Sequence, residues 1–338
     1  MCQPLCYSTI LCDPLWLPMD YDVIGDIHGQ AEKLEALLRK LGYTETAGAW
    51  RHAARQAVFV GDFIDRGPAQ IRSVNIARRM LDAGAAMAVM GNHELNAIAW
   101  HTRDPQNPDE FLRPHFSAEH GSKNRKQHAV FLAEVEGKPA LHEEIIQWFL
   151  TLPLWLDLPE LQVVHACWHA KYIAWLSSDR QSGRFLTSGL MAAASKKPQD
   201  QAETDDPTPS LFKAVDALTK GLEIALPAGT RFQDKDGFWR DHVRLRWWDE
   251  RSTTYRSAAM LSAAEREELP DLPIPANARV EGVNKPTFFG HYWLTGVPSL
   301  ESIRAVCVDY SAGNGGPLVA YRFQGEPHLS PKQFIWVD

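Results

Sequence analysis

Short apolar runs alternate with helix-like segments in the N-terminal part of the chain. Apolar runs occupy residues 21–24, 57–60 and 86–90, and each is followed by a glycine and polar residues. Leucines recur at helical spacing between residues 30 and 41, and a second helical segment spans about residues 69–83, each ending at a glycine. The order strand, helix, strand, helix, strand predicts an α/β fold with a largely parallel sheet covered by helices. Sites in such sheets lie in the loops at the carboxyl ends of the strands.

Polar segments interrupt this pattern further along the chain. Residues 101–140 are polar and are interrupted by Pro105, Pro108 and Pro114, which indicates an insertion over the site. A helix is expected at about residues 141–150, followed by a hairpin whose second strand is residues 161–164. A second insertion is expected at about residues 170–285, and residues 195–210 within it are expected to form an exposed loop. Three further strands are predicted near the C-terminus, at residues 287–289, 303–308 and 318–321.

The domain organisation expected from these segments is simple. Residues 1–18 are expected to form an N-terminal extension ahead of the first strand. Residues 19–338 are expected to form a single domain that carries both insertions.

Composition narrows the class of protein. The 338 residues are 45% hydrophobic and 23% charged, as in a globular protein, and the net charge of -7 argues against non-specific nucleic-acid binding, which needs a basic surface. No apolar run reaches the roughly 20 residues of a membrane span, so no membrane association is expected. Five cysteines, an odd number, form no disulfide framework, and a cytoplasmic location is therefore expected. They are Cys2, Cys6, Cys12, Cys167 and Cys307.

The first chemical motif is Gly-Asp-Ile-His-Gly, which follows the first predicted strand. Asp26 and His28 lie two residues apart between glycines that permit a tight turn, so their side chains could chelate one metal ion. Taken alone, such a short string is more often an ordinary polar loop.

The second motif is Gly-Asp-Phe-Ile-Asp-Arg-Gly-Pro, after the second predicted strand. The carboxylate of Asp62 could bridge two cations, Asp65 could orient a histidine, and Arg66 could bind phosphate oxygens in a bidentate fork. The alternative interpretation is a surface turn with an Asp–Arg ion pair.

The third motif is Gly-Asn-His-Glu, after the third predicted strand. The amide oxygen of Asn92 could ligate a metal ion, and the imidazole of His93 would point away from the strand end. By itself the pair is more typical of a hydrogen-bonded turn.

Together the three motifs resemble those of the calcineurin-like metallophosphoesterases. The resemblance is closest to the branch of Ser/Thr phosphoprotein phosphatases and bacterial diadenosine-tetraphosphate hydrolases, which shows GDxHG, GDxxDRG and GNHE. Residues 148–153 with the following Val-Val-His-Ala, and the Phe-Gly-His-Tyr-Trp string at 289–293, are similar to the stretches around two further metal-binding histidines of that branch. The resemblance covers residues 21–169 and 286–310. It implies the four-layer calcineurin-like fold, with central β-sheets flanked by helices and inserted cap segments.

The resemblance also implies a role for each matching residue. Metal one would be held by Asp26, His28 and Asp62. Metal two would be held by Asp62, Asn92, His165 and His291, so that Asp62 bridges the two. His93 would donate a proton to the leaving oxygen, Asp65 would orient His93, and Arg66 would bind phosphate oxygens.

The cofactor expected from this set is a pair of divalent metal ions. Mixed nitrogen and oxygen ligands favour Mn, with Fe or Zn as alternatives. The expected reaction is hydrolysis of phosphate monoesters, in a phosphoprotein or a small phosphorylated molecule, by hydroxide bridging the metals. The alternatives are a dinucleoside polyphosphate hydrolase, such as one acting on diadenosine tetraphosphate, and an inactive binding protein on the same fold.

The sequence departs from the phosphoprotein phosphatase pattern at one place, and one expected residue of the pattern is not assigned. Ala166 and Cys167 stand where those phosphatases carry Gly-Gly after the metal-binding histidine. A second phosphate-binding arginine is expected between His165 and His291, an interval that contains Arg240, Arg244 and Arg246, without a choice among them. Four histidines of the first insertion are further candidates for substrate contact, namely His101, His115, His120 and His128.

Overall fold

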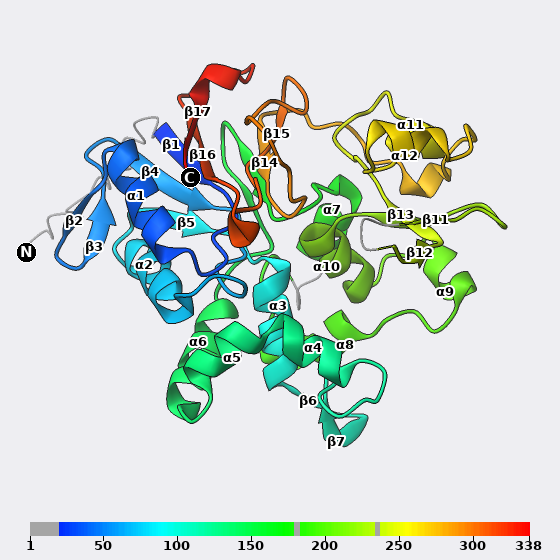
Figure 1. The fold of residues 1–338 in the computed structure, drawn as a ribbon, viewed down its shortest axis with the longest axis horizontal. Helices are drawn as coiled ribbons and strands as arrows, with labels where there is room; N and C mark the ends of the chain where they lie inside the picture. Colours follow the sequence, from blue (N-terminus) through cyan, green and yellow to red (C-terminus); the bar gives the residue numbers. More distant parts are fainter. Residues whose placement is uncertain (1–19, 179–182, 234–236) are drawn as a thin grey trace, which may run out of the picture.

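The strands and helices predicted for the N-terminal part are present in the structure, a computed structural model that describes residues 20–178, 183–233 and 237–338. In chain order they are β1 (Asp20–Ile24), α1 (Ala31–Leu41), β4 (Arg55–Phe59), α2 (Gln70–Asp82) and β5 (Ala86–Ala88). A hairpin that the sequence pattern did not predict, β2 (Thr44–Thr46) with β3 (Ala49–Arg51), lies between α1 and β4. Figure 1 shows these elements together at one side of the molecule. The expected N-terminal extension lies outside the described residues.

The first sheet has five strands in the order β17-β16-β1-β4-β5. Strands β1, β4 and β5 run parallel, as predicted, so their carboxyl ends lie at the same edge. The two outer strands come from the C-terminus, β16 (Leu318–Phe323) and β17 (Phe334–Val337), and β16 runs antiparallel to β1. The sheet is therefore mixed rather than purely parallel, and the N- and C-terminal parts of the chain share it.

The second sheet has four strands in the order β15-β14-β9-β8. Its strands are β8 (Trp155–Asp157), β9 (Gln162–Val164), β14 (Thr287–Phe289) and β15 (Ala305–Cys307). The strands β9, β14 and β15 are parallel, and β8 forms the predicted hairpin with β9. The strand after residue 286 therefore returns beside β9, although more than a hundred residues separate them in sequence.

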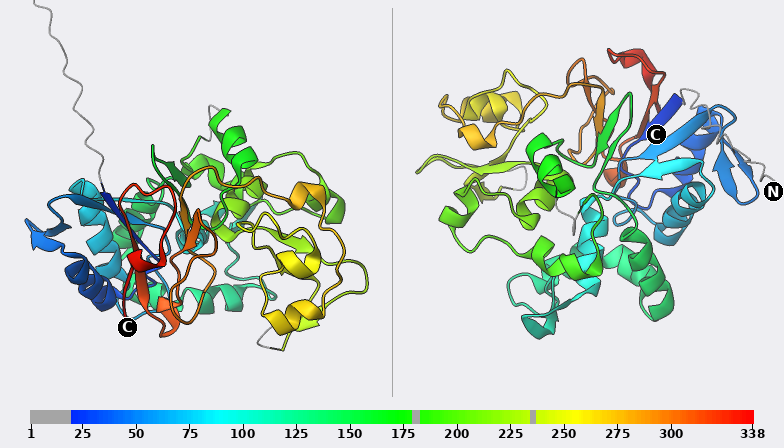
Figure 2. Two further views of the ribbon diagram at one scale, coloured as in Figure 1. Left: turned by 90° about the horizontal axis from the view of Figure 1, so that it is seen from above. Right: turned by 180° about the vertical axis from the view of Figure 1, so that it is seen from behind.

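The two sheets enclose an apolar layer of buried side chains. Val23 and Val58 of the first sheet pack in the same cluster as Val163 and Phe288 of the second, all four fully buried. Helices α1 and α2 cover the outer face of the first sheet, and α7 (Ala170–Ser178) and α10 (Leu211–Lys220) lie beside the second (Figure 2). Helix, sheet, sheet and helix form the four layers expected for the calcineurin-like fold.

The first inserted segment folds into small elements of its own. They are β6 (Arg103–Asp104), β7 (Asn107–Phe111), α4 (Gly121–Gln127) and α5 (Ala129–Val135), between α3 (Asn92–His101) and α6 (Pro139–Phe149). Glu134 of α5 accepts hydrogen bonds from the backbone N–H groups of Gln70 and Ile71, at 2.7 and 2.9 Å. Because a carboxylate at a helix N-terminus satisfies free N–H groups there, this contact fixes the insertion to α2.

The second inserted segment carries short helices, two two-stranded sheets and a hydrophobic core of its own among the described residues. Its helices are α8 (Met191–Ser195), α9 (Gln201–Asp205), α10, α11 (Tyr255–Ala258) and α12 (Ala263–Glu267), and its strands are β10 (Glu223–Ala225), β11 (Phe232–Gln233), β12 (Trp239–Arg240) and β13 (His242–Arg244). Residues 195–210 were expected to form a loop, but α9 lies within them, capped by Asp200, whose side chain accepts a hydrogen bond from the backbone of Glu203. Among the described residues, no helix is long and apolar enough to cross a membrane.

Candidate metal centre

The loops that follow β1, β4 and β5 meet at the carboxyl edge of the first sheet. The backbone N–H groups of Ile27 and His28 both donate to the carbonyl of Asp62, at 3.0 and 2.8 Å. Glu94 ties the second loop to the third, since its carboxylate accepts from the backbone N–H of Asp62 and of Phe63, both at 2.8 Å. The three sequence motifs are therefore joined by hydrogen bonds into one structure.

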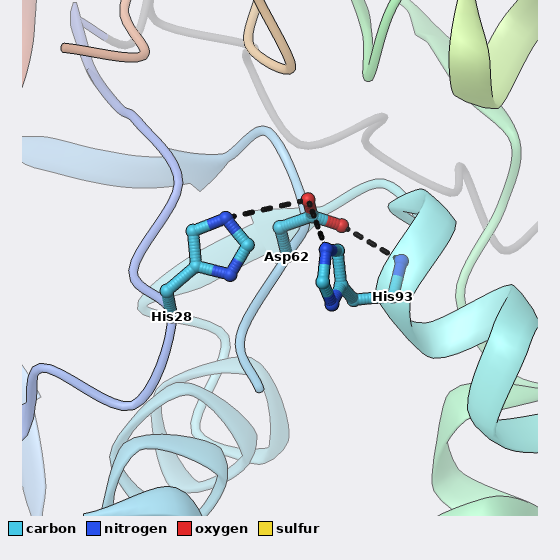
Figure 3. A group of neighbouring side chains, drawn as sticks. All are labelled: His28, Asp62 and His93. Carbon is cyan, nitrogen blue, oxygen red and sulfur yellow. Dashed lines mark hydrogen bonds and ion pairs between the residues drawn. The ribbon is translucent and has the colours of Figure 1, made fainter. Parts of the chain in front are cut away.

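Asp26, His28 and Asp62 lie together and are buried. The Nδ1 of His28 donates to the carbonyl of Ile64 at 2.9 Å, which leaves the Nε2 lone pair facing Asp62 Oδ2 at 3.6 Å (Figure 3). Asp26 Oδ2 accepts from the backbone N–H of His291 at 3.0 Å. The loop after β14 is thereby tied to the loop after β1, and the first predicted ligand set is brought together.

Asn92, His165 and His291 form a second group around Asp62. The Nδ1 of His165 donates to the carbonyl of Val60 at 2.7 Å, so its Nε2 lone pair faces Asn92 Oδ1 at 3.1 Å and Asp62 Oδ2 at 3.4 Å. His291 Nδ1 lies 2.8 Å from the same Asn92 oxygen. The possible ligand atoms of Asp62, His165 and His291 all lie within 4.8 Å of one another, as do those of His28, Asp62 and His93.

Two observations show that the residues of both groups fit metal ions. Asp26 Oδ1 and His28 Nε2 are buried and have no hydrogen-bond partner among the described residues. The Nε2 atoms of His28 and His165 face oxygen atoms, an arrangement that is repulsive unless a proton or a metal cation lies between them. A backbone carbonyl that fixes the tautomer of a histidine is also the usual second partner of a metal-binding imidazole.

The electrostatics of the group point in the same direction. Burial, together with the charges of Asp309 and Asp62, raises the pKa of Asp26 well above its usual value. Burial lowers the pKa of His28 to about 4, so that its imidazole is neutral at pH 7, the form that binds metals. Buried carboxylates close together and neutral imidazoles beside them are the environment that divalent cations stabilise.

His93 lies beside these ligands but has a different partner. Its Nδ1 is 2.5 Å from Asp65 Oδ2, and its Nε2 faces the centre, 3.9 Å from Asp62 Oδ2. Burial alone lowers the pKa of His93, but the carboxylates of Asp62 and Asp65 outweigh it and raise the pKa to about 9. At neutral pH the imidazole is therefore protonated on Nε2, as a proton donor facing the site requires.

His128 is a residue of the first insertion whose partner the sequence did not indicate. It is 2% exposed, and its Nδ1 lies 2.8 Å from Asp65 Oδ1 and 3.0 Å from Oδ2, the oxygen that also accepts from His93. Burial works against ionisation of Asp65, but its hydrogen bonds to the two histidines outweigh burial and lower its pKa. One carboxylate therefore holds two imidazoles, one from the third motif and one from the insertion.

The arginines divide into those at the site and those that support the fold. The Arg66 guanidinium is exposed and lies over the ring of Trp293, with its carbon 4.7 Å from the ring centre. Arg246 is held by the Ser257 carbonyl and the Ser252 hydroxyl, so it supports its own segment. Arg244 lines the same cavity as Asn92 and His291, and its charge lowers the pKa of His291 further than burial alone. Of the arginines between 240 and 246, Arg244 is therefore the one at the site.

Two carboxylates near the site were not singled out from the sequence. Glu94 is fully buried and joins the second loop to the third, because Oε2 also accepts from the Gly91 N–H at 3.0 Å. Its position three residues after Gly91 is that of a helix capping box, a signal that the Gly-Asn-His-Glu string contains. Asp309 accepts from the backbone N–H of Trp293 at 2.7 Å, and no motif around it marks this role.

The backbone at the site is unusual. Eight non-glycine residues among those described have positive φ, and five of them are predicted site residues, while a sixth is Trp293. The five are His28, Asp62, Asp65, Arg66 and His291, with φ between 47° and 76°. Because a side chain makes this left-handed conformation unfavourable, the hydrogen bonds between the loops are needed to hold it.

The site brings together histidine, carboxylate and amide groups at the carboxyl ends of strands. In a fold of two sheets between helices, such a site defines the class of metallohydrolases. Residues 19–185 match the model of the calcineurin-like phosphoesterase family. The chain therefore carries a calcineurin-like phosphoesterase domain, and the family and fold class inferred from the motifs are confirmed.

Similar proteins include bacterial enzymes named bis(5'-nucleosyl)-tetraphosphatase PrpE [asymmetrical]. The one from Bacillus subtilis is 34% identical over 151 residues, which cover 44% of this chain and 57% of the relative. The one from Bacillus mycoides is 34% identical over 180 residues, which cover 51% of this chain and 66% of the relative. The matched part thus spans less than two-thirds of either relative.

Solved structures with a related fold include a protein serine/threonine phosphatase from Saccharomyces cerevisiae. It shares 15% identity, with coverage of 94% of this chain and 79% of the other, and a TM-score of 0.47. A cold-active protein-tyrosine phosphatase from a Shewanella species shares 15% identity over 95% of this chain and 80% of the other, with a TM-score of 0.46.

Proposed function

We propose that this protein is a metal-dependent hydrolase of phosphoric esters and anhydrides, and that its substrates are dinucleoside polyphosphates. The observation that carries the reaction type is the convergence of His28, Asp62, His165 and His291, whose possible ligand atoms cluster, with the His93–Asp65 pair beside them. The relatives named bis(5'-nucleosyl)-tetraphosphatase support the substrate class, in preference to the phosphate monoesters first expected from the sequence.

The metal ligands of the proposal are the six residues inferred from the motifs, with Asp62 shared between two ions. They are Asp26, His28, Asp62, Asn92, His165 and His291. Divalent cations held there, with Mn favoured over Fe or Zn, would supply an activated water molecule and neutralise charge on the phosphoryl oxygens.

The protein's own contribution to the reaction is a proton and two positive charges. His93 Nε2 faces the centre and donates its proton to the leaving oxygen, while Asp65 fixes the ring and stabilises its charged form. Arg66, held over Trp293, and Arg244, beside His291, bind the phosphoryl oxygens. No covalent bond between protein and phosphorus is needed.

A phosphomonoesterase acting on a phosphoprotein or a small phosphate ester is the second candidate. The observation that favours it is the intact Asp65–His93 pair with Arg66 beside it, since these groups serve a monoester as well as an anhydride. An inactive binding protein is disfavoured because none of the proposed ligands or His93 is substituted. We also place the protein in the cytoplasm, on the support of Cys167 and Cys307, which are buried and unpaired.

Hydrolysis of two substrates in parallel tests the proposal. The Mn-loaded protein is expected to hydrolyse both p-nitrophenyl phosphate and diadenosine tetraphosphate, with the higher kcat/KM for the second. His93→Ala is expected to keep its metal, measured by elemental analysis, and to lose about 10²–10⁴-fold in turnover. A metal-loaded protein inert toward both substrates would refute the enzymatic proposal, and a preference for the monoester would select the second candidate.

A further inference from the structure

A positively charged cavity opens beside the candidate metal centre. It has a volume of about 490 Å³, and its lining includes Asn92 and His291 from the second ligand group. Five cationic side chains line it, namely Arg113, Lys123, Lys197, Lys220 and Arg244, and its lining contains no aspartate or glutamate. This is unexpected in a chain with a net charge of -7, and it makes the cavity a site of concentrated positive charge.

Most of this charge is not neutralised within the protein. Arg113 donates to the neutral oxygens of Asn96 and Gln127, at 2.9 and 2.6 Å. Lys123 and Lys197 are exposed and form no ion pair with any described residue. Arg244 has a buried Nε without a hydrogen-bond partner in the described part of the chain. Of the five, Lys220 alone forms an ion pair among the described residues, with Asp216 at 2.9 Å.

The two inserted segments build the cavity together. Arg113 and Lys123 come from the first insertion, at the end of β7 and in α4. Lys197 and Arg244 come from the second, after α8 and at the end of β13. Helix α3, which begins at the proposed ligand Asn92, packs against α8 (Figure 1), and residues of α3 line the cavity. Both insertions therefore contribute cations to a cavity that is also lined by Asn92 and His291.

The size of the cavity indicates what it can hold. A volume of about 490 Å³ lies within the roughly 300–1,000 Å³ of pockets that hold small-molecule ligands. A single phosphoryl group at the metals would contact Arg66 and Arg244 but would leave Lys123 and Lys197, on the insertions, without a partner. A linear chain of phosphates would bring one negative charge or more to each of these cations.

We infer that this cavity is a subsite for the phosphates next to the one being hydrolysed, and that it makes a linear polyphosphate chain the preferred substrate feature. The inference rests on the proposed function and assigns a role to the two inserted segments. A monoester would use the metal centre alone, whereas a polyphosphate would use the centre and the cavity. The cavity therefore acts as the determinant that separates the two candidate substrate classes.

A charge-reversal pair with a matched control tests the inference. Lys123→Glu/Lys197→Glu alters two exposed side chains in the cavity, and Lys138→Glu/Lys332→Glu makes the same change in net charge at two exposed lysines outside it. In the Mn-loaded full-length chain at fixed free Mn, the cavity pair is expected to raise KM for diadenosine tetraphosphate and to weaken binding of inorganic tripolyphosphate, each by about tenfold. The control pair is expected to leave both within about twofold, because charges beyond about a Debye length are screened.

The outcomes separate this inference from the proposed function. Equal weakening of orthophosphate and tripolyphosphate, or equal effects of the cavity pair and the control pair, would overturn the subsite. Selective loss of tripolyphosphate binding in a protein that hydrolyses neither substrate would refute the proposed function and support the subsite. Hydrolysis of diadenosine tetraphosphate with an unchanged KM in the cavity pair would support the proposed function and refute the subsite. Thermal melting of each variant checks that the fold is retained.

Discussion

His93 and His128 share one oxygen atom of the Asp65 carboxylate, with their Nδ1 atoms 2.5 and 3.0 Å from Oδ2. His128 belongs to the inserted segment and is buried, so the insertion reaches the proton donor of the site through a single carboxylate. Its role is that of a positioning residue, because it contacts Asp65 and none of the candidate metal ligands among the described side chains.

Removal of the His128 hydrogen bond is expected to lower turnover more than substrate binding. His128→Phe should reduce kcat by about tenfold, since loss of a residue that orients a functional group typically costs about 10–100-fold. KM should change by less than about threefold, a range too small for a lost substrate contact. His128→Asn, whose amide can place an N–H near the position of Nδ1, should recover most of kcat. A fall in melting temperature with unchanged kcat would show that His128 is only structural.

Asp65→Asn is expected to shift the pH dependence of the reaction. His93 must be protonated to donate, and its pKa is raised to about 9, so activity is present at neutral pH and is lost as the pH rises through that value. Asparagine removes one of the carboxylate charges that stabilise the protonated imidazole, so the pKa of His93 falls and activity is lost at a lower pH. The measurement is kcat/KM against pH with p-nitrophenyl phosphate. An alkaline limb that stays in place would contradict the assignment of His93 as the acid.

Asp62→Asn is expected to abolish binding of both metal ions together. Asp62 Oδ2 lies 3.6 Å from His28 Nε2 and 3.4 Å from His165 Nε2, one histidine from each ligand group. Loss of its charge therefore weakens both positions. Metal stoichiometry after gel filtration should fall from about two Mn per chain to less than about 0.5. Retention of one full equivalent would disprove the bridging role.

Gly290→Ala is expected to weaken metal binding without altering any ligand. A Cβ at Gly290 would lie 2.0 Å from Asp26 Oδ1, which cannot be accommodated unless the carboxylate moves. Gly189→Ala is the matched control, since its Cβ would meet only the Thr187 hydroxyl, at 3.9 Å. The Mn concentration that half-saturates activity should rise by about tenfold or more in the first variant, as for loss of other groups that orient ligands. The same concentration in both variants would show that Asp26 does not bind metal.

The sequence predicts which loops carry the candidate ligands because the patterns that mark these loops are local. Asp26, Asp62 and Asn92 follow the ends of β1, β4 and β5 by two, three and four residues, and parallel strands place their carboxyl ends together. The same logic located the strand before His165. Each of these inferences needed only a motif and the sense of a strand.

The parts that the sequence did not reveal depend on contacts between distant segments. His128 lies 63 residues from Asp65, in a polar stretch with several other histidines, and nothing local marks it as the partner. Strand β17 completes the first sheet by pairing with β16, although its residues are only partly buried and carry a weak alternation. The cavity is formed by two insertions whose packing no local pattern specifies. These features depend on contacts between residues that are far apart in the sequence, and a single sequence does not show which distant residues meet.

The left-handed backbone at His28, Asp62, Asp65, Arg66 and His291 has a consequence for protein engineering. Copying the six ligand side chains onto the strand ends of an unrelated sheet would not reproduce the site, because ordinary loops there do not adopt positive φ at non-glycine residues. A transplant would also need the buried Glu94 carboxylate, whose hydrogen bonds hold the second and third loops. A functional transplant would therefore have to include the hydrogen-bonded loops themselves, because the ligand side chains alone do not define the geometry of the site.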